Sequence, residues 1–156
     1  MQTVIVGVDG SSGARAALEF AAEEAAVREA KLHVVAAWEV GPTPVGRFST
    51  VDLIETYRTS AEEARQAASD YLESVWPALE VTAETWEGPA ADVLVSLARE
   101  ADLLVVGNRG RGDVASLVLG SVSHHVVQHA PCPVVVIPRR WGAADPVRAI
   151  SHRSAV

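Results

Sequence analysis

The sequence is poor in basic residues. Its 156 residues include 13 Lys and Arg against 20 Asp and Glu, which gives a net charge of −7. Proteins that bind nucleic acid usually carry a basic surface that neutralises phosphates, so this balance argues against DNA or RNA as a partner. A small anionic ligand remains compatible with the charge, because backbone N–H groups and a few local arginines can bind it.

Cysteine and long apolar segments are also lacking. The single cysteine, Cys132, excludes an internal disulfide and favours a reducing compartment. The opening segment MQTVIVGVDG goes straight into a strand-like run, without the basic and long apolar regions of a leader peptide. No apolar stretch approaches the ~20 residues that cross a bilayer. We therefore expect a cytoplasmic protein without a membrane partner.

What the sequence does contain is a regular alternation of short apolar runs and helical periodicity. The length fits one domain. Continuous apolar runs are typical of parallel strands that are buried on both faces. The pattern predicts an α/β fold, with a five-stranded parallel sheet and helices on both faces. Strands are expected at 4–9, 32–38, 79–86, 103–106 and 134–137, and helices at 14–25, from 49 or 50 to 76, from 89 onward and at 121–129.

Three local features refine this picture. The long helix that ends before Pro77 is expected to bury one apolar stripe, formed by Ile54, Tyr57, Ala61, Ala64, Ala68, Leu72 and Val75. Pro89 is expected at the first helical position of the next helix, where its missing N–H costs nothing. The segment 139–156 has no periodicity and is expected to be a mobile tail outside a domain of residues 1–138.

Open α/β sheets bind ligands beyond the carboxyl ends of their strands, where the strand order reverses. Glycines and serines gather at two such ends, in Gly7-Val8-Asp9 and in the segment from Gly107 to Ser123. Gly107 and Gly110 are expected to adopt conformations closed to other residues and to let a ligand approach. The N–H groups after Gly120 would favour an anion. The alternative is an ordinary glycine loop with a serine cap.

The spacing of Gly107, Gly110 and Gly120-Ser121 resembles the ATP-binding signature of the universal stress protein family. The segments VIVGVDGS, LHVVAAW, ADLLVVGNRG and APCPVVVIP resemble the same family at both ends of the chain. His124 and His125 depart from it, because charged or small residues often occupy these positions. The resemblance implies a flavodoxin-like sheet of order 3-2-1-4-5 or 3-2-1-5-4, and the switch-point rule favours the first.

The resemblance also implies a function and a set of contacts. ATP, with Mg²⁺, would bind in a homodimer that pairs through the fifth strand, and the protein would act as a nucleotide-dependent sensor or regulator in a stress response. Asp9 and Gly7 would lie at the adenosine, and the backbone of Ala37 would meet the adenine. Ribose and phosphates would contact the signature residues Gly107, Arg109, Gly110, Gly120, Ser121, Val122 and Ser123.

Other candidates compete with this interpretation. His125 and His129 have a spacing that can bind a metal, but no third ligand is evident, so no metal site is predicted. Cys132 lacks an activating base. An enzyme that slowly hydrolyses or transfers from ATP is the alternative function, although only Asp113 supplies a carboxylate within the loop. A purely structural protein without nucleotide affinity is disfavoured by the retained glycines.

Overall fold

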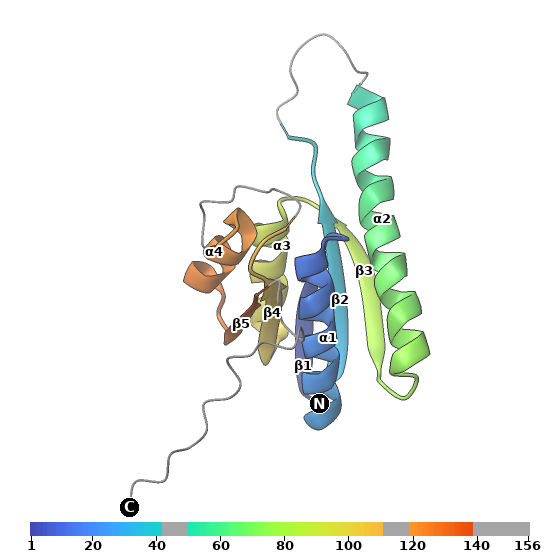
Figure 1. The fold of residues 1–156 in the computed structure, drawn as a ribbon. Helices are drawn as coiled ribbons and strands as arrows, with labels where there is room; N and C mark the ends of the chain where they lie inside the picture. Colours follow the sequence, from blue (N-terminus) through green and yellow to red (C-terminus); the bar gives the residue numbers. More distant parts are fainter. Residues whose placement is uncertain (42–49, 111–118, 139–156) are drawn as a thin grey trace, which may run out of the picture.

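The computed structural model describes residues 1–41, 50–110 and 119–138. Within these residues, five strands and four α-helices alternate, with a short 3₁₀ helix, η1, after the third α-helix (Figure 1). The expected mobile tail, 139–156, lies outside the described residues. The elements are β1 (Thr3–Val8), α1 (Ser12–Val27), β2 (Lys31–Trp38), α2 (Thr50–Val75), β3 (Val81–Glu87), α3 (Ala90–Leu97), η1 (Ala98–Glu100), β4 (Leu103–Gly107), α4 (Ser121–His129) and β5 (Val134–Ile137).

The sheet is parallel throughout and has the order β3-β2-β1-β4-β5. This confirms the predicted fold class and strand order. The chain adds β2 and β3 on one side of β1, then crosses back to add β4 and β5 on the other. Between β1 and β4 the direction of winding reverses, and the loops that leave these two strands separate there.

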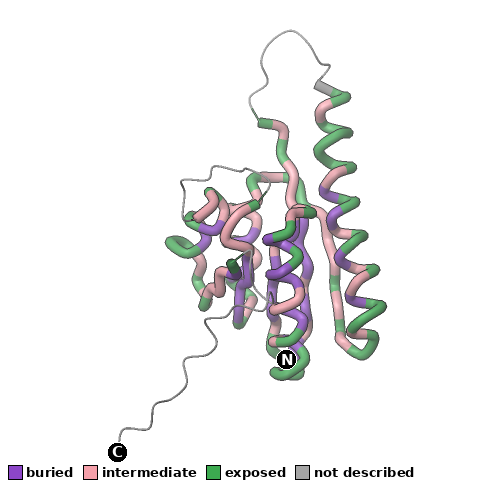
Figure 2. Tube along the Cα trace, in the orientation of Figure 1, coloured by how far each residue is buried: buried purple, intermediate pink, exposed green. Residues whose placement is uncertain are grey.

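Apolar side chains of the strands form two cores, one on each face of the sheet. Val4, Val6 and Val34 face α1 and α2, whereas Ile5, Val35 and Leu104 face α3 and α4. Figure 2 shows the buried residues following the central strands, and the exposed ones on the outer sides of the helices. Alanines dominate the inner face of α1, so its backbone lies close to the sheet.

The ends of α1 are set by local hydrogen bonds. Ser11 is the N-cap, and its Oγ accepts a bond of 3.1 Å from the N–H of Ala14. At the other end the Ala30 N–H donates to the Ala25 carbonyl, and Glu29 has a φ of 51°. This pair of features is a Schellman motif, in which glycine usually takes the left-handed position. A non-glycine residue therefore sits in a conformation that favours glycine.

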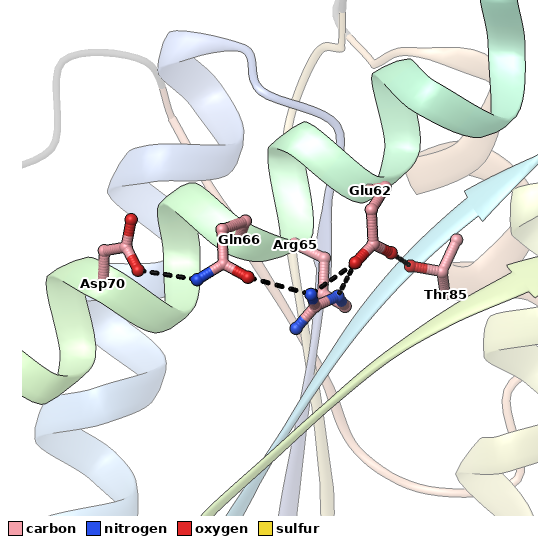
Figure 3. A network of polar contacts seen from close by, with 5 residues as sticks. All are labelled: Glu62, Arg65, Gln66, Asp70 and Thr85. Carbon is pink, nitrogen blue, oxygen red and sulfur yellow. Dashed lines mark hydrogen bonds and ion pairs between the residues drawn. The ribbon is translucent and has the colours of Figure 1, made fainter.

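Helix α2 is joined to the edge strand β3 by a chain of polar contacts (Figure 3). The Thr85 hydroxyl donates a bond of 2.8 Å to Glu62, which also accepts from the Arg65 guanidinium. Arg65 donates to Gln66, and Gln66 donates to Asp70. The Arg65 and Thr85 bonds lower the pKa of Glu62 from 4.5 to about 2. This carboxylate is the link between helix and strand.

Two predictions about the helices were wrong in detail. Ala61, Ala64, Ala68 and Leu72 are buried as expected, but Ile54, Tyr57 and Val75 are 38%, 47% and 51% exposed. The first turns of α2 stand beyond the sheet (Figure 1), so no strand lies beneath their apolar side chains. Pro89 is the N-cap of α3, with a ψ of 124°, and the helix begins one residue later. Most other boundaries differ from the predicted ones by one or two residues.

Candidate functional site

A cavity of about 240 Å³ lies at the carboxyl ends of the central strands, where the winding reverses. It is built by the ends of β1, β2 and β4, by the first turns of α1 and α3, and by the start of α4. All ten residues predicted from the sequence line this one cavity, namely Gly7, Asp9, Ala37, Gly107, Arg109, Gly110, Gly120, Ser121, Val122 and Ser123. The fold thus brings together the residues that the sequence indicated as one site.

The first turn of α4 lies at the cavity and has backbone donors that no described side chain occupies. Gly120 is its N-cap, and no side chain of the described residues caps this end of the helix. By contrast, the Ser11 hydroxyl already occupies a donor at the start of α1. Unpaired N–H groups at a helix N-terminus carry a partial positive charge, which favours an anion. Because Ser121, Val122 and Ser123 line the cavity, this end of the helix forms part of its wall.

The carbonyl group of Asn108 closes the loop that carries this turn. It accepts a bond of 2.7 Å from the N–H of Gly120, and the Ser123 hydroxyl lies 3.0 Å from it. Ser123 is 1% exposed, and its hydroxyl also lies 3.0 Å from the Gly120 carbonyl. The Ser123 proton therefore stays within the loop, and its hydroxyl oxygen can only accept from other groups. Sequence reasoning missed this bracing role, because it depends on a carbonyl that any residue supplies.

Gly107 and Gly110 are required because a side chain would have no space there, and this corrects the sequence interpretation. Among the described glycines only Gly10 and Gly88 have a positive φ, so Gly107 and Gly110 do not need a conformation closed to other residues. A Cβ on Gly107 would lie 2.7 Å from the carbonyl carbon of Gly13 in α1. The close approach is therefore between β4 and α1. Gly107 fixes the position of one wall of the cavity.

Asp9 connects the two loops across the cavity. Its Oδ1 accepts a bond of 2.9 Å from the N–H of Ser11, and this bond orients the carboxylate. A Cβ on Gly110 would lie only 2.6 Å from Oδ2, so the second oxygen rests against the glycine backbone. Asp9 and Arg109 are the charged residues among the described ones that line the cavity. One acidic residue thus follows β1 and one basic residue follows β4, the two strands between which the direction of winding reverses.

Seven further residues line the cavity that the sequence prediction omitted. Their positions follow from patterns that were visible: Val35 precedes Ala37 by two residues and so shares its face of the strand. Leu94 follows Ala90 by one helical turn. Val8 and Val106 adjoin predicted residues at the ends of β1 and β4, and Ser11 and Ala14 lie at the start of α1. The full set is Val8, Ser11, Ala14, Val35, Ala90, Leu94 and Val106. Asp113, the carboxylate considered for a hydrolytic role, lies outside the described residues.

The paired histidines and the single cysteine were the other candidates for a chemical site. His125 and His129 stack with their ring centroids 4.3 Å apart. Within the part of the chain that the structure describes, no three His, Cys, Asp or Glu residues could hold a metal ion together. Burial raises the pKa of the Cys132 thiol, which disfavours the reactive thiolate.

The family model of the universal stress protein family matches residues 1–138. This chain belongs to the universal stress protein family. Universal stress protein Rv1996 of Mycobacterium tuberculosis is 34% identical to it over 165 aligned positions, which cover 94% of this chain and 51% of the relative. The chain therefore spans about half the length of the curated relatives it matches.

Solved universal stress proteins have the same fold. The universal stress protein UspA from Lactobacillus plantarum superposes with a TM-score of 0.74 at 26% identity, covering 87% of this chain and 97% of that one. A universal stress protein in complex with cAMP gives 0.66 at 29% identity, covering 87% and 96%. The Archaeoglobus fulgidus protein in complex with dAMP gives 0.64 at 27% identity, covering 88% and 98%.

None of the helices of this universal stress protein, in the portion that is described, combines the length and apolar character needed to cross a bilayer.

Proposed function

We propose that this universal stress protein binds an adenine nucleotide, ATP with Mg²⁺ in the cell, and acts as a nucleotide-dependent sensor or regulator in a stress response. The observation that carries the proposal is the first turn of α4, which no described side chain caps and which lies at a cavity lined by every signature position. The cAMP and dAMP complexes of similar proteins support an adenine nucleotide as the ligand class.

The cavity suggests how such a ligand would lie. Phosphates would accept hydrogen bonds from the N–H groups of the first turn of α4, with Arg109 beside them. The adenosine would extend toward β1 and β2, against Asp9, Gly7 and Ala37. No acidic cluster suited to a divalent cation occurs among the described residues, so Mg²⁺ would be held mainly by the phosphates. It would neutralise part of their charge.

Nucleotide binding is tested by titration calorimetry and by the Gly120→Val variant. A Cβ on Gly120 would lie 3.4 Å from the Asn108 carbonyl oxygen and from the Arg109 Cα, which is ordinary contact. The two further methyl groups of valine would crowd the loop or the cavity, so we expect at least a tenfold loss of ATP affinity in a folded protein. Gly41→Val is the matched control, because no heavy atom lies within 4 Å of its added Cβ.

Two results would contradict the proposal. One is a wild-type protein that neither retains an adenine nucleotide when the purified sample is denatured nor binds one in calorimetry. The other is a folded Gly120→Val variant that binds ATP as tightly as the Gly41→Val control does.

We further propose a homodimer that pairs through β5. β5 is one edge of the sheet, its valines are partly exposed, and exposed strand edges invite pairing with another chain. The backbone N–H of Leu104 donates to the Pro133 carbonyl, and that of Asn108 donates to the Ile137 carbonyl. The odd-numbered residues of β5 therefore direct their backbone N–H and C=O groups at β4. By alternation the Val136 N–H points outward.

Val136→Pro should therefore convert the dimer into monomers while the bonds between β4 and β5 persist. Sedimentation velocity at micromolar concentration measures this change, and a monomeric wild-type protein would contradict the dimer. The single cysteine supports a cytoplasmic location, which we include in the proposal.

A further inference from the structure

The first turns of α3 and α4 meet beside the cavity and are linked by one pair of side chains. α3 contributes Ala90 and Leu94 to the cavity wall, and α4 contributes its first three residues. Asp92 lies in the first turn of α3, and its Oδ1 is 3.4 Å from the Nε2 of His125 on α4. A change in this contact would alter how the two walls sit against each other.

Few of the described residues place a charge near His125. α4 packs against α3 and β5. Asp92 is the one charged residue in α3, and β5 contains none. Arg99 and Glu100 lie in η1, after the C-terminal end of α3, away from the cavity. On its own helix, His125 has the exposed His124 beside it and His129 one turn further along. Within the described parts of the chain, Asp92 and His129 are therefore the titratable groups in contact with His125.

Asp92 and His129 have opposite effects on a positive charge at His125. A protonated His125 attracts the Asp92 carboxylate, whereas a neutral one makes only a polar contact. The His129 ring is stacked on that of His125, so protonation of both rings would place like charges close together. The His129 Nδ1 lies 2.9 Å from the His125 carbonyl oxygen, which only accepts, so this nitrogen carries a proton. His129 is thus held in place by the helix itself.

His125 also shares a helix face with the predicted phosphate contacts. It follows Ser121 by four residues, and such residues lie above one another on a helix. A positive charge there adds to the partial charge at the start of α4. Histidine side chains change charge between pH 5 and 8, whereas an ordinary carboxylate stays ionised over that range.

We propose that Asp92 and His125 are positioning residues of the nucleotide site, whose contact strengthens when His125 takes up a proton. The contact holds α4 against α3 one turn beyond the predicted phosphate contacts, so nucleotide affinity rises as the pH falls from 8.0 to 5.5. This inference rests on the proposed function, because it describes the regulation of the same site.

A double-mutant cycle at two pH values tests it. The affinity for ATP with Mg²⁺ is measured by calorimetry for the wild type, Asp92→Asn, His125→Gln and the double variant, at pH 5.5 and 8.0. Because ATP itself takes up a proton in this range, each variant is compared with the wild type at the same pH. The product of the two single losses should exceed the loss of the double variant by about two- to fivefold at pH 5.5, the size expected for a partly exposed ion pair. At pH 8.0 this excess should fall below about 1.5-fold.

His124→Gln is the matched control, because it removes an exposed histidine from the neighbouring position of the same helix. The His124→Gln variant should bind ATP with the same affinity as the wild type at both pH values. A wild type that binds no adenine nucleotide refutes the proposed function and this inference with it. A wild type that binds ATP, together with a His125→Gln variant that shows the same pH dependence, overturns the inference alone. Urea unfolding without nucleotide verifies that every variant is folded.

Discussion

Replacing Gly107 with alanine tests whether space, rather than backbone conformation, explains the first signature glycine. The added Cβ would lie 2.7 Å from both the carbonyl carbon and the carbonyl oxygen of Gly13, and 3.2 Å from the Ala14 nitrogen. Non-bonded carbon atoms rest at about 3.5–4.0 Å, so the overlap approaches about 1 Å. All three neighbours are backbone atoms of α1, which cannot rotate away as a side chain would. The helix or the strand must therefore shift.

Overpacking of this kind costs typically about 1–3 kcal/mol of folding free energy. For a domain of this size, each kcal/mol lowers the melting temperature by about 2–4 °C, so we expect a decrease of about 2–12 °C. Because the first turn of α1 also lines the cavity, nucleotide affinity should fall with it. Urea denaturation measures the stability, and calorimetry the affinity.

Two other glycines calibrate the effect. A Cβ on Gly7 would lie 2.9 Å from the Leu94 Cδ1, the end of a flexible side chain, so Gly7→Ala should cost less than Gly107→Ala. A Cβ on Gly41 has no heavy atom within 4 Å, so Gly41→Ala should leave the stability within about 0.5 kcal/mol of the wild type. If Gly107→Ala unfolds at the same urea concentration as Gly41→Ala, the close approach of β4 and α1 does not constrain this position.

Three further predictions follow from individual groups. Glu29→Gly should raise the free energy of unfolding by up to about 1 kcal/mol, because glycine adopts the φ of 51° without strain; an unchanged urea midpoint would contradict this. The stability that the Arg65 and Thr85 bonds give through Glu62 is present above pH 4.5 and is lost as the pH falls toward about 2, because the folded-state pKa is lowered. Urea unfolding at a series of pH values should therefore show that Glu62→Gln is less stable than the wild type near neutral pH, and that this difference in free energy of unfolding shrinks below pH 4.5. A difference that stays constant with pH would refute this role. Hydrolysis of ATP should stay well below ~1 s⁻¹ in a single-turnover assay, because the cavity offers ground-state contacts and uniform binding does not raise the rate; faster turnover would mark an enzyme.

The sequence predicted some elements to the residue and others less well, for identifiable reasons. The boundaries of α4 and β5 were predicted correctly because Gly120, Pro131 and Pro133 mark them. Periodicity indicated which face of α2 is apolar, but it contains no information on how far the sheet extends below that face. Tyr57 was therefore expected to be buried and is exposed.

Sequence patterns also predicted only part of the candidate site. The spacing of the glycines predicted where they gather, but a glycine needed for space and one needed for a positive φ look alike in a sequence. Gly107 was accordingly given the wrong physical reason. The contact between Asp92 and His125 could not be predicted, because it joins two helices far apart in the chain and has no characteristic spacing. Such pairs become visible only once the helices are placed.

The composition of the cavity wall has a consequence for the entropy of binding. Glycine, alanine, serine and valine supply most of the lining, and Arg109 is the one long polar side chain among the described residues there. Immobilising a flexible side chain on binding costs about 0.5–1.5 kcal/mol, and this wall contains few that could be immobilised. A ligand would meet a surface whose shape is already set by the backbone. Substitutions that move the backbone of α1 or of the α4 turn should therefore change affinity strongly, even where the substituted side chain does not touch the ligand.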